Sequence, residues 1–253
     1  MDLGLKGGRA LVTGGTKGIG RAIADCFAGE GAAVAICARN PAEVTEAVAA
    51  LRGTGMAAFG QALDVSDGLA LQGFVTAAAE ALGGLDMIVS NVSALAISGD
   101  EAAWRAGFET DLLGAVRLVE AAMPHLERSD AASITFISSV SGREIDFAAG
   151  PYGAMKAALI HYAQGLAFQL AGKGIRANTV SPGNTYFPGG VWERIETGNP
   201  DLFAKAMALN PTGRMGRPEE MARPTVFLAS PAASFVTGTN LVVDGALTRG
   251  VQL

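Results

Sequence analysis

Short runs of β-branched and aliphatic residues alternate with longer helical patterns along the chain, and this alternation limits the fold more than any other feature. The clearest strands are expected at residues 10–13, 33–37, 87–90, 134–138, 176–180 and 241–243, and a weaker one near 57–63. Helical patterns lie between them, at residues 19–28, 42–51, 69–82, 103–123 and 152–170. Because strands that alternate with helices form right-handed βαβ units, we predict an α/β protein. Its doubly wound parallel sheet should have about seven strands, with helices on both faces.

The composition agrees with one domain of this kind. Hydrophobic residues make up 49% of the 253 residues, and glycine contributes 34 of them. Parallel strands that are buried on both faces produce such a composition. Since neither a Pro/Ser-rich linker nor an internal repeat interrupts the chain, residues 1–253 are expected to form a single domain.

The distribution of charged and apolar residues argues against several classes of protein. The formal net charge is −5 and the Lys and Arg residues are scattered, whereas a nucleic-acid-binding surface needs a concentrated basic patch. No apolar run approaches the roughly 20 residues that span a bilayer, and residues 1–9 lack the apolar core of a signal peptide. A cytoplasmic location without a membrane partner is therefore expected. Cys26 and Cys37 fit no metal-binding spacing, so no metal site is predicted.

One segment interrupts the alternation. Five prolines and six glycines fall between Ser181 and Pro218. Because a long irregular connection after a strand is usually a binding loop, residues 184–217 are expected to form an irregular substrate lid. The alternative is a surface excursion with one or two short helices. Its large apolar residues either line the substrate or attach the segment to the body of the protein: Tyr186, Phe187, Trp192, Phe203 and Met207.

A glycine-rich turn joins the first strand to the first helix, in the sequence Thr13-Gly14-Gly15-Thr16-Lys17-Gly18-Ile19-Gly20. Gly14 permits a tight turn, Gly18 permits close approach to a phosphate, and Gly20 lets the helix and strand pack together. The helix N-terminus then presents free N–H groups to a pyrophosphate. Strand, turn and helix together predict a Rossmann-type dinucleotide-binding domain, whose first cofactor contacts are Gly14, Thr16, Lys17, Gly18, Ile19 and Gly20.

The end of the second expected strand indicates which dinucleotide binds. An acidic residue there would accept from the 2′-hydroxyl of the adenosine ribose. This chain has Cys37-Ala38-Arg39-Asn40 instead, and Arg39 can hold a phosphate through its guanidinium fork. With Lys17 on the same side, two cations and no acid favour NADP(H) over NAD(H). The alternative is that both cations are solvated surface residues.

Tyr152 and Lys156 stand four residues apart at the start of a helix, so they share one face. A free phenol loses its proton only near about pH 10, but a nearby ammonium group stabilises the phenolate. Such a pair can move a proton to or from a carbinol oxygen. Ser139, at the end of the fifth strand, can hydrogen-bond the substrate carbonyl. Ser138 and Ser141 compete for that role, and Ser139 is preferred on spacing.

These motifs together resemble the classical short-chain dehydrogenase/reductase family. The resemblance extends to Asn178-Thr179-Val180-Ser181-Pro182-Gly183 and to the tail from Phe235 to Gly245, and so covers nearly the whole chain. It implies that Tyr152 is the general acid/base, that Lys156 also holds the nicotinamide ribose, and that Ser139 orients the carbonyl. It further implies cofactor contacts from Asp64 (to the adenine), Val65, Asn91, Pro182, Gly183 and Thr185.

The chain departs from the family pattern at two functional positions. The family has an Asn in the long central helix, where this chain has Asp111 in Thr110-Asp111-Leu112-Leu113-Gly114. Either Asp111 works as a variant proton-relay acid, because burial favours the neutral form of a carboxyl group, or the relay is weakened. The family's cofactor-contacting Thr aligns with Phe187, and the nearby Thr185 is the candidate to replace it.

The resemblance therefore implies an oxidoreductase that transfers a hydride between NADP(H) and a ketone or secondary alcohol. The chain resembles 3-oxoacyl-carrier-protein reductases and related ketoreductases, but cations are few in the 184–217 segment, so an acyl carrier is not predicted. The alternative is a non-catalytic sensor or scaffold that binds the cofactor with the same fold. A homotetramer, or a homodimer, is expected by resemblance.

Overall fold

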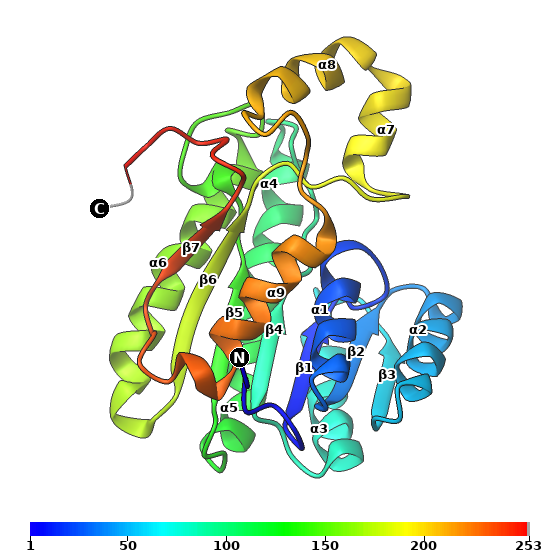
Figure 1. Cartoon of the computed structure of the whole chain (residues 1–253), viewed down its shortest axis with the longest axis vertical. Helices are drawn as coiled ribbons and strands as arrows, with labels where there is room; N and C mark the ends of the chain where they lie inside the picture. Colours follow the sequence, from blue (N-terminus) through cyan, green and yellow to red (C-terminus); the bar gives the residue numbers. More distant parts are fainter. Residues whose placement is uncertain (252–253) are drawn as a thin grey trace.

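A computed structural model describes residues 1–251, which are built around one parallel sheet of seven strands in the order β3-β2-β1-β4-β5-β6-β7 (Figure 1). The strands are β1 (Arg9–Thr13), β2 (Ala33–Ala38), β3 (Ala58–Ala62), β4 (Met87–Ser90), β5 (Ser133–Ile137), β6 (Arg176–Pro182) and β7 (Asn240–Val243). Every neighbouring pair is parallel. The predicted fold class is confirmed, and each predicted strand is present within two residues of its expected bounds.

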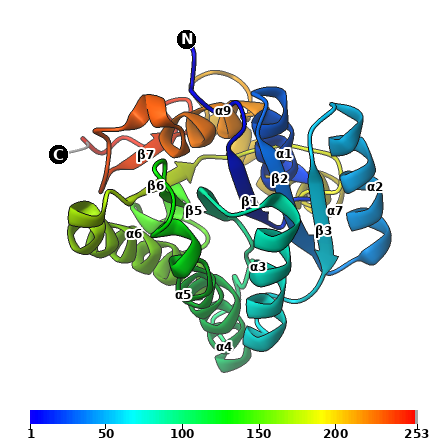
Figure 2. The same ribbon diagram turned by 90° about the horizontal axis from the view of Figure 1, so that it is seen from below.

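Helices cover both faces of this sheet, as the view from below shows (Figure 2). One layer consists of α1 (Gly18–Gly29), α2 (Pro41–Gly53) and α9 (Pro218–Ala229). The other consists of α3 (Gly68–Leu82), α5 (Gly114–Leu126) and α6 (Pro151–Leu170). Each layer has its own apolar core against the sheet, which fully buries Phe27 on one side and Phe74 on the other. Burial of one side chain of this size stabilises the fold by about 1.5–3 kcal/mol.

The order of the strands reverses next to β1. The chain runs from β1 outward to β3, returns to β4 beside β1, and then runs outward to β7. Open α/β sheets bind ligands beyond the carboxyl ends of their strands at such a switch point. The loops that follow β1 and β4 are therefore the expected place for a site.

The single helix predicted over residues 103–123 is wrong in detail. It is divided into α4 (Glu101–Gly107), a π-helical turn (Phe108–Leu113) and α5. A π-turn widens the helix by one residue, and such turns are common at functional sites. Apolar residues recur through this region at an unbroken helical spacing, so the sequence pattern does not reveal the turn. Asp111 lies inside the turn and is buried.

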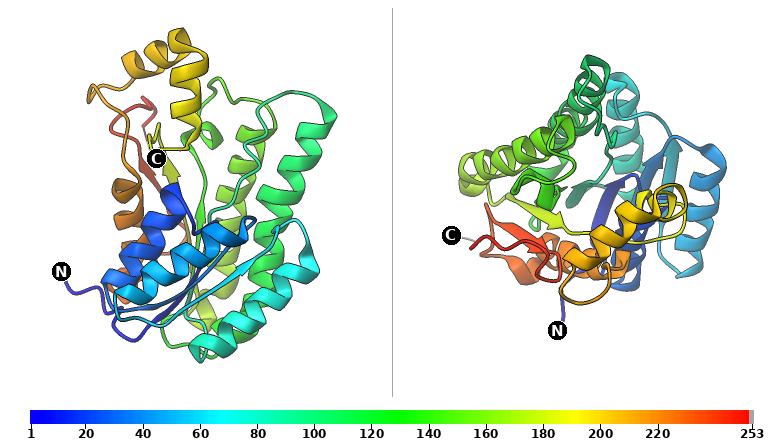
Figure 3. Two further views of the ribbon diagram at one scale, coloured as in Figure 1. Left: turned by 90° about the vertical axis from the view of Figure 1, so that its right-hand side faces the viewer. Right: turned by 90° about the horizontal axis from the view of Figure 1, so that it is seen from above.

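The 184–217 segment is less irregular than predicted, because it contains two short helices, which only the alternative interpretation included. It contains α7 (Val191–Gly198) and α8 (Pro200–Leu209), which stand beyond the carboxyl ends of the strands (Figures 1 and 3). Pro200 does not prevent α8, because it takes the first helical position, and the Asn199 side chain caps the helix by accepting from Leu202 N. Helix α9 was not predicted either, because Pro218 and Pro224 interrupt its helical sequence pattern.

Candidate active site

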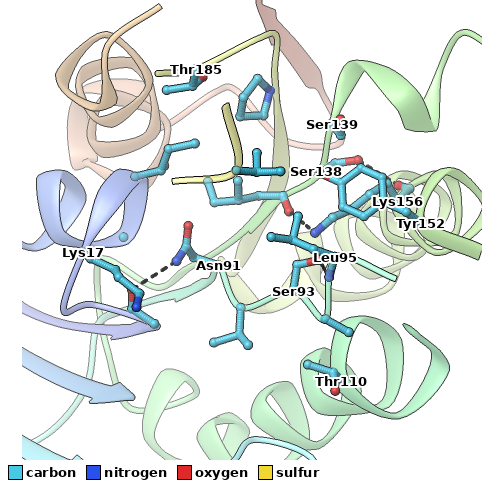
Figure 4. A pocket seen from close by; sticks show the side chains of 18 of the residues that line it. Lys17, Asn91, Ser93, Leu95, Thr110, Ser138, Ser139, Tyr152, Lys156 and Thr185 are labelled. Carbon is cyan, nitrogen blue, oxygen red and sulfur yellow. Dashed lines mark hydrogen bonds between the residues drawn. The ribbon is translucent and has the colours of Figure 1, made fainter. Parts of the chain in front are cut away.

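A cleft of about 690 Å³ lies where the carboxyl ends of the strands meet the 184–217 segment. It runs from Arg39 and Glu43, past the glycine turn, to Tyr152 and Trp192. Figure 4 shows Lys17 and Asn91 on one side of it and Tyr152 and Lys156 on the other. Most of the predicted site residues line it: Gly14, Thr16, Lys17, Ile19, Gly20, Arg39, Asp64, Val65, Asn91, Ser139, Tyr152, Lys156, Pro182, Gly183 and Thr185. Two predicted residues, Gly18 and Asp111, are not part of this lining.

The glycine turn has the geometry of a phosphate cradle. Gly14 and Gly18 have φ angles of +68° and +55°, which disfavour any residue with a side chain. A Cβ atom on Gly20 would overlap the Gly14 carbonyl oxygen. Among the described residues no side chain caps α1, so the first N–H groups of the helix remain available to an anion. The backbone here can hold the pyrophosphate of a dinucleotide.

Asn91 supports this turn from the end of β4. Its Nδ2 donates to the carbonyl oxygens of Thr13 at 3.1 Å and Gly14 at 3.3 Å. Its backbone N–H donates to Thr13 Oγ1 at 3.0 Å. From the other side, the carbonyl of Cys37 accepts from the N–H of Gly14 at 2.8 Å. Asn91 therefore fixes the cradle, in addition to lining the cleft.

The carboxyl ends of β2 and β3 contribute polar groups at the end of the cleft opposite Tyr152. Arg39 follows β2 and Asp64 follows β3. Hydrogen bonds from the N–H and hydroxyl of Ser66 lower the pKa of Asp64, and the nearby Arg39 lowers it further. Asp64 is thus a carboxylate at neutral pH and retains acceptor capacity, which suits an amino group such as that of adenine.

Sequence reasoning missed an acid at this end. Glu43, on the first turn of α2, lines the cleft and accepts from Thr16 Oγ1 at 3.1 Å. Its carboxylate also lies 3.7 Å from Lys17 Nζ. Residues 37–40 at the end of β2 hold no acid, as predicted, but Glu43 adds a carboxylate beside Lys17. The acid comes from the following helix rather than from the strand end, so its position depends on where α2 begins.

At the other end, Tyr152 and Lys156 project from α6 into the cleft (Figure 4). Lys156 Nζ lies 5.6 Å from the centre of the Tyr152 ring. The ammonium group donates to the carbonyl of Ile137 at 3.0 Å and lies 3.3 Å from Asp111 Oδ1. The predicted pair is thus adjacent, and the positive charge is held by groups at the end of β5 and in the π-turn.

Asp111 is almost inaccessible, with 1% of its side chain exposed. Its Oδ2 accepts from the N–H of Ala94 at 2.8 Å, which ties the loop after β4 to the π-turn. Apart from the ion pair with Lys156, Oδ1 has no hydrogen-bond partner among the described residues. This arrangement suits a carboxylate that balances the charge of Lys156, since a buried charge is tolerated only when it is paired.

The three competing serines have different partners. Ser138 is buried and donates to the carbonyl of Lys156 at 2.8 Å, which joins β5 to α6. Ser141 donates to Asp146 Oδ2 at 2.6 Å. Ser139 contacts only Ser141: its hydroxyl donates to the Ser141 hydroxyl and accepts from the Ser141 backbone N–H, both at 3.2 Å. Ser139 is thus the most available hydroxyl beside Tyr152, and Asp146 is a cleft residue that the sequence analysis did not identify.

The 184–217 segment closes the cleft with aromatic side chains. The Phe187 ring lies directly against Gly18, where a Cβ atom would overlap it. Thr185 is buried and donates to the carbonyl of Gly183 at 3.1 Å. Trp192, 5% exposed, meets the Phe147 ring edge-on with 5.7 Å between centroids. The cleft therefore has an apolar wall facing the side of Ser139 and Tyr152.

Two kinds of site are not found within residues 1–251. This part of the chain contains no group of three or more His, Cys, Asp or Glu side chains arranged to bind a metal ion. None of its helices combines the length and the hydrophobicity that crossing a membrane requires.

Comparison with known proteins agrees with this geometry. Residues 14–248 match the family model described as enoyl-(acyl carrier protein) reductase. The chain is 42% identical over 257 residues to isoepoxydon dehydrogenase patN of Penicillium expansum, covering 100% of this chain and 99% of that one.

Solved structures are similar over the same length. A short-chain dehydrogenase from Burkholderia cenocepacia, in complex with NADP, superimposes with a TM-score of 0.88 at 30% identity, covering 96% of this chain and 99% of the other. L-sorbose reductase from Gluconobacter frateurii, complexed with NADPH and L-sorbose, gives a TM-score of 0.90 at 28% identity, covering 99% and 100%. The chain belongs to the short-chain dehydrogenase/reductase family.

Proposed function

We propose that this protein is an NADP(H)-dependent oxidoreductase that transfers a hydride between the cofactor and a ketone or secondary alcohol, with Tyr152 as general acid/base. The observation that carries the proposal is one continuous cleft with a phosphate cradle at one end and, at the other, the adjacent Tyr152 and Lys156 with Ser139 in the same lining. The similarity to dehydrogenases and to NADP-bound structures supports the same conclusion.

Different residues of the cleft would bind different parts of the cofactor. The N–H groups at the start of α1 would bind the pyrophosphate, and Arg39 and Lys17, which line the cleft, would hold a 2′-phosphate on the adenosine ribose. Asp64 and Val65 would hold the adenine, and Pro182, Gly183 and Thr185 would line the nicotinamide. When bound, NADP(H) supplies or accepts the hydride.

Side chains of the protein transfer a proton to the substrate oxygen and stabilise its charge. In the direction of reduction, Tyr152 donates its proton to the substrate carbonyl oxygen while the carbonyl carbon gains the hydride, which yields the alcohol. The Ser139 hydroxyl turns from Ser141 to donate to the same oxygen and stabilises its developing negative charge. The Lys156 ammonium group stabilises the phenolate that remains. Oxidation follows the same steps in reverse.

Asp111 enters this scheme as a variant member of the proton relay. Its carboxylate lies against Lys156 and can accept a proton through that ammonium group. An alternative role for the whole chain is a sensor that binds the cofactor without turnover. The exchange of the family's amide for a carboxylate is the observation that favours the sensor, and the intact Ser139, Tyr152 and Lys156 oppose it.

The 184–217 segment acts as the substrate lid. Phe187 and Trp192 bring apolar surface to the cleft, and Phe147 extends it from the loop after β5. This wall suits a compact apolar or ring-containing ketone better than a long charged carrier. The exposed large side chains Phe168 and Phe235 support assembly as a homotetramer or homodimer.

Oxidation of NADPH, followed by absorbance, tests the proposal with a panel of ketones. The panel should include L-sorbose, simple ring ketones and the ketone products of the relatives' reactions. We expect turnover with at least one compact ketone. Tight binding of NADPH without turnover on any member would support the sensor instead.

A further inference from the structure

The adenosine end of the cleft holds a carboxylate among the groups that would meet a phosphate. Glu43 Oε2 accepts from Thr16 Oγ1 at 3.1 Å, and Oε1 accepts from Asn40 Nδ2 at 3.4 Å. Lys17 Nζ lies 3.7 Å from Oε1. These four residues and Arg39 all line the cleft. Glu43 therefore already uses the donors from the glycine turn that an incoming anion would need.

Local structure fixes the position of Glu43. The Asn40 side chain caps α2 by accepting from the N–H groups of Ala42 and Glu43, and Pro41 occupies the first helical position. An acid in the first turn is also favoured by the helix dipole, which explains a carboxylate on this turn of α2 but not its contacts across the cleft. The side chain reaches from α2 to the glycine turn, and 38% of it is exposed. It can thus respond to what binds between the two elements.

The 2′-phosphate of NADP(H) and the 2′-hydroxyl of NAD(H) would interact with this carboxylate in opposite ways. A phosphate would compete with Glu43 for Lys17 and Thr16 and would be repelled by its negative charge. A hydroxyl would donate to the same carboxylate. Arg39 has the opposite preference, because its guanidinium group binds a phosphate best.

We infer that Glu43 is a specificity-determining residue that opposes Arg39, and that its carboxylate weakens the preference of the chain for NADP(H) over NAD(H). This inference rests on the proposed function, since it assumes that a dinucleotide binds in the cleft. The relative affinity for the two cofactors then depends on a carboxylate in α2, whereas an acid with this effect is expected at the end of β2.

Binding measurements on Glu43→Gln test the inference without any turnover. The amide keeps the size and the hydrogen-bonding reach of the side chain but removes its charge. We expect Glu43→Gln to bind NADP+ and the fragment 2′,5′-ADP about tenfold more tightly by isothermal titration calorimetry, a change typical of one electrostatic contact. NAD+ and AMP should bind equally well or up to about threefold more weakly.

Glu46→Gln is the matched control, because Glu46 is exposed on the same helix and does not line the cleft. It removes the same charge from α2 and should leave all four affinities within about twofold. Equal tightening of NADP+ by both variants, or no change in the ratio of NADP+ to NAD+ affinity in Glu43→Gln, would overturn the inference. A wild-type chain that binds neither dinucleotide would overturn the proposed function as well, so the two failures are distinguishable.

Discussion

The two ends of the cleft each contain a lysine beside a carboxylate, but in opposite surroundings. Lys156 and Asp111 lie 3.3 Å apart with 2% and 1% of their side chains exposed. Lys17 and Glu43 lie 3.7 Å apart with 66% and 38% exposed. An exposed pair contributes little to stability and exchanges readily with other partners. A buried pair cannot lose one member without leaving an uncompensated charge.

This difference indicates how each end works. At the adenosine end the partners can separate, and a bound anion can take the place of the carboxylate. At the catalytic end the pair is a permanent part of the protein, tied to β5 through Ile137 and to the loop after β4 through Ala94. The protein thus combines an adaptable binding site with a fixed charge beside Tyr152.

Replacement of Lys156 by Met should have the largest effect on stability. It leaves the Asp111 carboxylate buried without a counter-charge, so we expect a loss of about 3–5 kcal/mol in the free energy of unfolding. Turnover should fall by about a hundredfold or more in the fraction that folds. Urea unfolding and the initial rate of NADPH oxidation measure the two effects. A stability within about 1 kcal/mol of the wild type would mean that the buried pair is not required as described.

Lys17→Met tests the exposed pair by the same chemical change. We expect the free energy of unfolding to change by less than about 1 kcal/mol, because water already solvates both partners. The affinity for NADP+ should fall by roughly tenfold, since one cation beside the phosphate is lost, while NAD+ is little affected. Unfolding and titration calorimetry on the same preparation check both. Destabilisation as large as that of Lys156→Met would contradict the claim that the exposed pair contributes less to stability than the buried pair.

Asp111→Asn should have the smallest effect on turnover. The amide oxygen can still accept from the Ala94 N–H, so the loop after β4 keeps its anchor. The Lys156 ammonium group keeps the Ile137 carbonyl and gains only a neutral amide oxygen as partners, so the free energy of unfolding should fall by about 3 kcal/mol, at the low end of the range for a broken buried pair. We expect turnover to be kept or raised, as kcat in the same assay shows. Complete loss of activity in a folded variant would contradict a role like that of the family's amide.

The sequence predicts the site residues whose identity or spacing is set by the local backbone conformation. Gly14 and Gly20 were identified because only glycine permits their conformation or their close packing. Tyr152 and Lys156 were identified because helical spacing places them on one face. These requirements are local and are therefore visible in a short stretch of residues.

The missed features depend on contacts between distant segments. Glu43 reaches the glycine turn only because α2 begins at Pro41, and Asp146 meets Ser141 only because the loop after β5 folds back. The π-turn around Asp111 interrupts a helix whose apolar spacing looks regular. The ring of Phe187 reaches Gly18 from a segment more than a hundred residues away in the sequence, which no local pattern predicts.

Tyr152→Phe tests the central claim most directly. The change removes only the hydroxyl, so cofactor binding and folding should be retained. With the best ketone of the panel, the account predicts that the rate of NADPH oxidation falls by about 10²–10⁴-fold while the dissociation constant for NADPH stays within about twofold of the wild type. An unchanged rate in this variant would contradict the role of Tyr152 as the group that transfers the proton.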